Sequence, residues 1–291
     1  MIYFLISIAL CISLNINKKK DSYYLFLFNS LFILVFACIR YGSGTDYFAY
    51  EHIYKSFGSN FNDYHFYAQG VEPGYGLLNI LGKKSGVSFQ LFIGVLSFLS
   101  LLVFFHTIIH YSNNFLFSLF IFFENYYIPY FSNQWRQGFA MIFGLYIIIN
   151  YINKPKKALF FIQVILLSLT FHFSILSLLL IPLFDKLFSE KFIFSFFKVF
   201  RFSILCFLFS FIFFKFLLLI LSSFDNFIIT KLINYVKEMR ISLPSIAVRA
   251  ISVFLIMYLL GKKIQETKDL YLIKLYRIFI YGFFVYYVFH K

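Results

Sequence analysis

Six of the charged or titratable side chains that border or interrupt long apolar stretches are candidates for chemistry: Arg40, Asp46, Glu72, Arg136, His172 and Arg249. A guanidinium binds phosphate oxygens through two parallel hydrogen bonds. A histidine or a carboxylate whose pKa lies near the working pH can accept a proton from an attacking hydroxyl. If these side chains share one site, that site could bind a phosphate group and activate a nucleophile.

The two acidic candidates and Arg40 also have structural interpretations. Arg40 and Asp46 enclose the segment Tyr-Gly-Ser-Gly-Thr, whose glycines permit the tight backbone of a substrate-lining loop. Arg40 could instead extend to lipid headgroups or pair with Asp46, and Asp46 could cap a helix that begins at the next residue. Glu72 precedes a proline, as an acidic residue at a helix start often does.

The remaining candidates lie at or inside apolar stretches. Arg136 follows Trp135, so it could anchor the chain to lipid headgroups as well as bind a phosphate. His172 lies between two phenylalanines and could be a hydrogen-bonded packing residue. Arg249 lies about one turn inside an apolar stretch, where a charge needs a partner or a wet cavity, which favours a functional role.

The composition indicates that the elements positioning these residues are membrane helices. Hydrophobic residues make up 61% of the 291 residues, and the mean hydropathy is +0.82. Apolar runs near the length of a spanning helix, about 20 residues, recur along the chain. We expect an all-α, polytopic membrane protein with about 10 transmembrane helices in a single domain, residues 1–291. The first apolar stretch lacks the flanks of a cleaved signal peptide, so we expect it to be retained.

Basic clusters predict the orientation of these spans. Lysines at 18–20, at 154 and 156–157, and at 262–263 fall on alternate loops, which the positive-inside rule places in the cytoplasm. The polar segment 40–88 and the loop 222–245, which has amphipathic helical spacing, are then extracytoplasmic. This topology requires the apolar run 158–184 to be split at His172. It places all six candidate residues at or just below the outer surface.

Four motifs, in this order, resemble the EpsG family of bacterial polysaccharide polymerases, relatives of Wzy-type polymerases: Arg40-Tyr-Gly-Ser-Gly-Thr-Asp46-Tyr47, Glu72-Pro-Gly-Tyr75, Arg136-Gln137 and Phe171-His172-Phe-Ser174. The resemblance extends from the N-terminus through at least the span that follows His172. It implies a GT-C-like helical bundle in the bacterial cytoplasmic (inner) membrane with an outward-facing active site. Such polymerases commonly continue beyond the point matching Lys291, so the resemblance also predicts a shortened C-terminus.

The implied reaction transfers a glycan from one undecaprenyl diphosphate to a sugar hydroxyl of a second lipid-linked unit and releases the lipid diphosphate. The resemblance assigns the diphosphate to Arg136, Arg249 and Arg40, and the base to His172 first, with Asp46 or Glu72 next. It assigns sugar contacts to four further residues: Tyr41, Tyr47, Tyr75 and Gln137. The implied partners are the donor and acceptor lipids, the bilayer, a chain-length regulator and a flippase.

Other functions are separated from this one by particular features. The net charge of +14 lies in clusters between spans, so we expect no nucleic-acid partner. The histidines and cysteines lack ligand spacing, so we expect no metal and no cofactor. A flippase or exporter of lipid-linked oligosaccharide should show a polar path inward, whereas the inner halves of the spans are apolar. An envelope glycan ligase or acyltransferase would use the same outer-face residues, and a scaffold would tolerate their substitution.

Overall fold

The computed structural model describes residues 6, 10, 19–39, 41–59, 71–205 and 243–289, and every regular element in this part of the chain is helical. The predicted all-α class is therefore confirmed for these residues. The chain divides into two compact units, Met1–Leu178 and Leu179–Lys291, which are described separately. The single membrane domain and the GT-C-like arrangement stay predictions.

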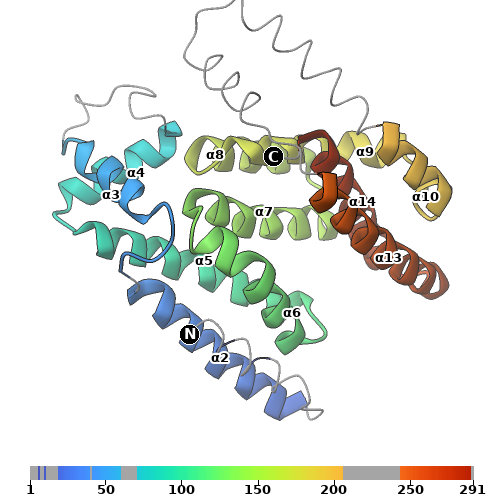
Figure 1. Ribbon diagram of the computed structural model, residues 1–291, viewed down its shortest axis with the longest axis horizontal. Coiled ribbons are helices and arrows are strands. Elements are labelled where there is room, and N and C mark those ends of the chain that lie inside the picture. The colour runs from blue at the N-terminus through green and yellow to red at the C-terminus, as the bar shows by residue number, and fades with distance from the viewer. Residues whose placement is uncertain are drawn as a thin grey trace, which may run out of the picture. The chain divides into compact units, whose positions relative to one another are not determined.

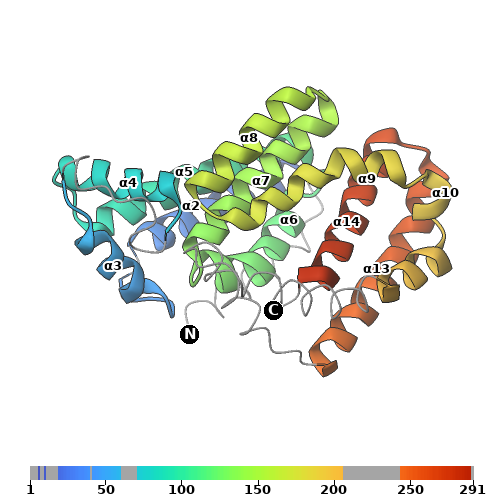
Figure 2. The ribbon, with the colours of Figure 1, turned by 90° about the horizontal axis from the view of Figure 1, so that it is seen from above.

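Apolar helices form the body of the first unit: α2 (Lys19–Ile39), α5 (Phe89–Tyr111), α6 (Phe115–Phe122), α7 (Trp135–Asn153) and α8 (Lys157–Thr170). Helix α5 packs against α2 on one side and α7 on the other, and α8 packs on α7 (Figure 1). Seen from above, α7 and α8 again lie side by side (Figure 2). Side-chain caps define two helix starts, because Ser88 Oγ accepts the Leu91 N–H and Asn114 Oδ1 accepts the Phe117 N–H.

Two of the described helices have the length and apolar composition needed to cross a membrane, Lys20–Ile39 and Phe89–Tyr111. Two shorter apolar helices, Phe115–Ile128 and Lys157–Thr170, accompany them. These helices agree with a helical membrane protein. The number of about 10 spans stays a prediction.

The predicted span from Phe115 to Pro129 changes its helical form partway along. It begins as α6 and continues as the π-helix η2 (Phe123–Phe131). Pro129 has no backbone N–H to complete the α-helical ladder, and a wider turn accommodates a proline inside a helix. Rings four residues apart stack along η2, with centroids 5.1 Å apart for Phe123 and Tyr127 and 5.5 Å apart for Tyr127 and Phe131.

The polar segment 40–88 contains two helices, α3 (Tyr47–Ser56) and α4 (Pro73–Lys84). Figure 1 shows both at one end of the first unit, where α3 packs on α5 and α4 packs on α8. Pro73 is the first residue of α4, where its missing N–H costs no helical hydrogen bond. The described parts of the segment, 41–59 and 71–88, therefore contain helices that pack on the first unit.

The predicted break at His172 is present. Helix α8 ends at Thr170, and a 3-10 helix, η3 (Phe173–Leu180), begins three residues later. The side of the membrane on which this break lies is not tested by the structure and stays a prediction.

The second unit contains α9 (Ile181–Leu187), α10 (Glu190–Ile193), a helical stretch at 196–205, α13 (Leu243–Thr267) and α14 (Leu270–Phe289). Helices α13 and α14 pack as a hairpin, and α9 packs on α14. Helix α14 runs from Leu270 to Phe289 as predicted, but α13 continues through Gly261, Lys262 and Lys263, which were predicted to lie in a loop. Two further predicted spans, from about Met1 to Ile16 and from about Phe202 to Leu221, and most of the loop 222–245 lie largely outside the described residues.

Candidate functional site

A buried ion pair between Arg136 and Glu72 lies at the end of the first unit that carries α3 and α4. Arg136 is the second residue of α7, and its Nη1 donates to Glu72 Oε2, directly before α4. The Glu72 side chain is 4% exposed and the Arg136 side chain 17% exposed. A buried charge requires such a partner, because an unpaired ion at this depth is strongly disfavoured. The pair therefore ties the start of α4 to the start of α7.

Aromatic rings enclose the Arg136 guanidinium. Its Cζ lies 5.5 Å from the centre of the Tyr50 ring and 5.6 Å from that of Tyr75, distances suited to cation–π attraction. Tyr50 in turn stacks on Trp135, with ring centroids 5.5 Å apart and an angle of 10° between the planes. Burial raises the pKa of Tyr50, partly offset by the nearby Arg136 cation, and burial also raises the pKa of Tyr75. Both phenols therefore stay neutral at ordinary pH and present ring faces to the cation.

The glycine-containing loop docks on the turn before α7. Gly44 has a φ of +97°, and a Cβ at this position would lie 2.0 Å from the backbone oxygen of Ser132. The next N–H, that of Thr45, donates to Asn133 Oδ1 at 3.1 Å, while Asn133 Nδ2 donates to the Ile128 carbonyl at 3.1 Å. The glycine is required here by both its backbone angle and its close approach to another chain segment.

Asp46 lies at the N-cap position of α3 but its side chain makes no capping hydrogen bond. Its Oδ1 accepts a hydrogen bond from Thr45 Oγ1 at 3.1 Å, and its charge acts on the neighbouring Tyr50, where it raises the phenol pKa. The capping interpretation of Asp46 is therefore not supported by a hydrogen bond. The carboxylate is half-buried beside the ring that covers Arg136.

Packing contacts bring the His172 motif to the same region. A Cβ on Gly74, two residues after Glu72, would lie 2.7 Å from Thr170 Cα, two residues before His172. Phe139, one turn beyond Arg136 on α7, has its ring centroid 5.7 Å from that of Phe171. Three predicted motifs that are far apart in the sequence thus meet at one end of the first unit.

This close approach predicts the effect of enlarging Gly74. Gly74→Ala should lower the free energy of unfolding by about 1–3 kcal/mol, because the added methyl group would meet the backbone of Thr170 rather than a movable side chain. It should also disturb the Glu72–Arg136 pair. Gly144→Ala is the matched control, since its Cβ would lie 3.4 Å from two side-chain methyl groups, an ordinary contact. Equal melting temperatures for the two purified variants would contradict the packing argument.

The hydrogen bonding of His172 favours one form of its ring. The Ser174 backbone N–H donates to His172 Nδ1 at 3.2 Å. A neutral ring that accepts at Nδ1 carries its proton on Nε2. In this form Nε2 is a hydrogen-bond donor and not a proton acceptor. The predicted role of first-choice base stays untested, and the geometry favours a donor role.

The predicted sugar contacts differ in their exposure. Tyr75 and Tyr47 are 0% and 2% exposed, and Tyr47 donates its hydroxyl hydrogen to Gln90 Oε1 at 2.9 Å. Tyr41 is 74% exposed, with its ring centroid 5.5 Å from that of Tyr47. Gln137 is half-buried. Of the three tyrosines, Tyr41 is the one whose ring is open to a sugar in this conformation.

Two predicted diphosphate ligands cannot be placed in this site. Arg40 lies outside the described residues, and Arg249 lies in α13 of the second unit, where the backbone but not its side chain is described. Their convergence with Arg136 stays a prediction. Among the described residues no group of three or more histidine, cysteine, aspartate or glutamate side chains could hold a metal ion.

Two residues at this end of the unit, Tyr50 and Asn133, and a third residue in η2, Glu124, were not predicted as functional residues. Tyr50 covers Arg136, and its spacing of three residues from Tyr47 placed both on one face of α3. Asn133 holds the glycine loop. Glu124, an acid inside the predicted span from Phe115 to Pro129, has its Oε1 buried with no hydrogen-bond partner among the described residues. An acid within a span was a visible signal for a functional residue.

The fold and site define a helical protein that has, among the described residues, two helices long and apolar enough to cross a membrane and a buried, aromatic-covered arginine centre at one end of a helical unit. Residues 2–291 match the model of the EpsG family, so the chain belongs to the EpsG family. No curated protein and no solved structure matches the chain. The family relationship and the apolar helices together support a membrane protein with a polymerase-like role in polysaccharide synthesis.

Proposed function

We propose that the protein is a polysaccharide polymerase that joins undecaprenyl-diphosphate-linked repeat units at the outer leaflet of the bacterial cytoplasmic membrane. The observation that carries this proposal is the meeting of the Glu72, Arg136 and His172 motifs at one end of the first unit. Family membership supports the general class of activity. Donor and acceptor would be two lipid-linked oligosaccharides, and the lipid diphosphate would leave.

Arg136 is the group best suited to the leaving diphosphate. In this conformation Glu72 neutralises it, so the incoming diphosphate must replace Glu72 as the partner of the guanidinium. This exchange frees the Glu72 carboxylate beside the reacting groups. A carboxylate released in a partly dry site can accept the proton of the attacking sugar hydroxyl.

His172 then serves as a hydrogen-bond donor. Its Nε2–H can donate to a diphosphate or sugar oxygen while Ser174 holds Nδ1. The exposed ring of Tyr41 offers a stacking surface for a sugar. Asp46 is the second candidate base in this arrangement.

The test is deletion of the gene in its native host and complementation at matched membrane levels, with surface glycan length displayed on a gel. Deletion should leave single repeat units on the surface, because unpolymerised units can still be exported. Loss of all surface glycan would instead favour an exporter. Normal polymer in the deletion strain would contradict the proposed polymerase.

Complementation with His172 variants separates its two possible roles. His172→Gln keeps an N–H donor near the position of Nε2, so it should retain part of the polymer, whereas His172→Ala should leave single units. A base cannot be replaced by an amide. Equal loss of polymer in both variants would therefore contradict the donor role and restore the base role.

A further inference from the structure

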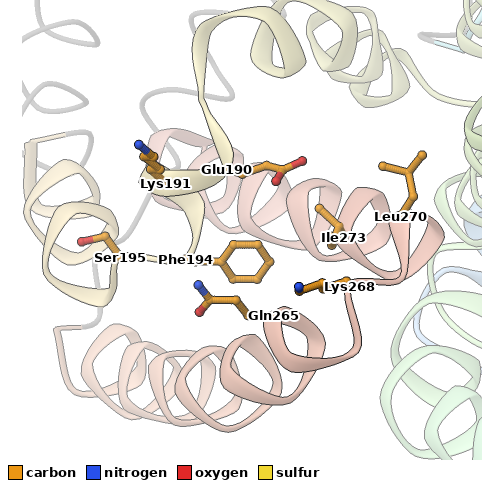
Figure 3. Close-up of a pocket in the computed structure, with 8 residues that line it drawn as sticks. All are labelled: Glu190, Lys191, Phe194, Ser195, Gln265, Lys268, Leu270 and Ile273. Carbon is orange, nitrogen blue, oxygen red and sulfur yellow. The ribbon is translucent and has the colours of Figure 1, made fainter.

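The second unit contains a cavity of about 660 Å³ at the connected end of the α13–α14 hairpin, next to α10. It is lined by eight residues, shown in Figure 3: Glu190, Lys191, Phe194, Ser195, Gln265, Lys268, Leu270 and Ile273. Its volume lies within the range of small-molecule sites, about 300–1,000 Å³. None of these residues belongs to the arginine site described above.

Aromatic packing fixes one wall of the cavity. The Phe194 ring stacks on Tyr276, with centroids 5.3 Å apart and an angle of 9° between the planes. The Tyr276 hydroxyl donates to the Met257 carbonyl at 2.9 Å, across the hairpin. A Cβ on Gly261 would lie 2.6 Å from that hydroxyl oxygen, so the glycine makes room for the ring. The wall is thus preformed by contacts between α10, α13 and α14.

Two lysines, Lys191 and Lys268, give the polar side of the cavity its positive charge, and the Gln265 side chain offers a hydrogen-bond acceptor beside them. Lys268, at a left-handed φ of 53°, and Gln265 extend toward the Phe194 ring, while Lys191 lies at the opposite edge (Figure 3). Among the described residues neither lysine has a carboxylate within ion-pair distance. Arg277 occupies the carboxylates instead, at 3.3 Å from Asp185 and 4.0 Å from Glu190.

The position of the cavity suits a lipid headgroup. It lies where α13 ends and α14 begins, and the connected end of a membrane hairpin is expected at headgroup level. Leu270 on its wall is 61% exposed, and Leu187 and Phe197 of the same unit are 65% and 71% exposed. Polar groups and apolar surface therefore occur together, as an amphiphilic ligand requires.

We propose that this cavity binds the headgroup of an anionic phospholipid that carries free hydroxyl groups, of the phosphatidylglycerol type. The phosphodiester contacts Lys268, with Lys191 at the edge. The glycerol hydroxyls donate to Glu190 or Gln265 oxygens, and the acyl chains lie over exposed apolar side chains such as Leu270. Basic pockets between helices at the cytoplasmic side of membrane proteins recognise anionic headgroups in this way. This inference goes beyond the proposed polymerase function and uses a different part of the chain.

The test counts lipids retained by the purified full chain in native mass spectrometry. Phosphatidylglycerol and phosphatidylcholine with identical acyl chains are titrated separately. Wild-type protein should retain one phosphatidylglycerol at a concentration about tenfold lower than phosphatidylcholine. Lys191→Gln/Lys268→Gln should abolish this preference. Ser195→Trp, which fills the cavity without changing the charge, should abolish it too.

The control is Lys262→Gln/Lys263→Gln, which removes the same charge from exposed positions outside the cavity. This variant should keep the preference for phosphatidylglycerol. If both double lysine variants lose that preference equally, the lipid is held by general electrostatic attraction to the protein, and the proposal is overturned. Displacement of the lipid by soluble glycerol phosphate at a similar concentration would show a site for free phosphate esters and would also overturn it.

Discussion

Replacing Arg136 by alanine is expected to reduce the surface glycan to single repeat units and to lower the amount of folded protein in the membrane. The substitution leaves Glu72 buried without its partner, which typically costs about 3–5 kcal/mol. It also removes the cation between the Tyr50 and Tyr75 rings, a further loss of about 0.5–2 kcal/mol. The single variant therefore changes stability and chemistry together.

The double variant Glu72→Gln/Arg136→Gln separates these effects. It removes both charges at once and leaves two amides of similar reach, so no unpaired ion remains buried. If Arg136 binds the leaving diphosphate, this variant should be present at near wild-type levels and still yield single repeat units. The measurements are membrane abundance, melting temperature of the purified protein and glycan length. Normal polymer from a folded double variant would show that the pair is only a structural tie.

An exposed ion pair in the same segment provides the control. Lys55 and Glu51 lie one turn apart on α3 with 2.8 Å between Nζ and Oε1, and the lysine side chain is 64% exposed. Such surface pairs contribute about 0–1 kcal/mol. Lys55→Gln should therefore leave both the melting temperature and the glycan length unchanged. A loss of polymer in this variant would indicate that any charge change in the segment is harmful.

The residues of the candidate site could be selected from the sequence, but which of these residues pair with one another could not be predicted from it. The Glu72, Arg136 and His172 motifs were each predicted to lie at one surface, and contacts through Gly74 and Phe139 bring them together. The pairing of Arg136 with Glu72, rather than of another arginine with another acid, depends on how the start of α4, a helix that packs on α8, is placed beside the start of α7. No local pattern specifies that arrangement.

The burial of two predicted sugar-binding rings, those of Tyr47 and Tyr75, could not be predicted from the sequence either. Tyr47 and Tyr75 have the residue type that stacks on sugars, but packing against Trp135 and near Arg136 covers them. Both core packing and ligand stacking require an aromatic ring, so residue type cannot separate them. Tyr41 differs only in its position on the exposed part of the loop.

Helix boundaries followed the sequence where capping residues define them and departed from it elsewhere. The start of α5 at Phe89 follows Ser88, and α14 begins after Asp269, whose Oδ1 accepts the Tyr271 N–H at 2.8 Å. Helix α13 continues past Gly261 and the two lysines that were predicted to lie in a loop, and Gly261 lies against Tyr276 inside the hairpin. A glycine required by packing resembles a glycine that ends a helix when only the sequence is seen.

The second large effect is expected for Gly44→Ala, which should detach the loop 41–47 from the turn before α7 and abolish polymer formation. A φ of +97° is disfavoured for alanine by an amount of order 1–3 kcal/mol. The added methyl carbon would also lie 2.0 Å from the Ser132 carbonyl oxygen, a distance that no side-chain rotation can relieve. Loss of docking removes the Thr45–Asn133 hydrogen bond and displaces the start of α3, and with it Tyr50, the ring over Arg136.

Two further substitutions distinguish docking of this loop from glycine strain in general. Gly86→Ala has a comparable positive φ of 68° but open space around its Cβ, so it should lower the melting temperature slightly and leave glycan length unchanged. Asn133→Ala removes the acceptor of the Thr45 N–H without adding a methyl group to the loop, and it should shorten the polymer partially. Protease susceptibility of the loop, measured on purified protein, should rise from Gly86→Ala to Asn133→Ala to Gly44→Ala. If Gly44→Ala matches Gly86→Ala in both protease susceptibility and glycan length, the docked loop does not hold the arginine site in its working form.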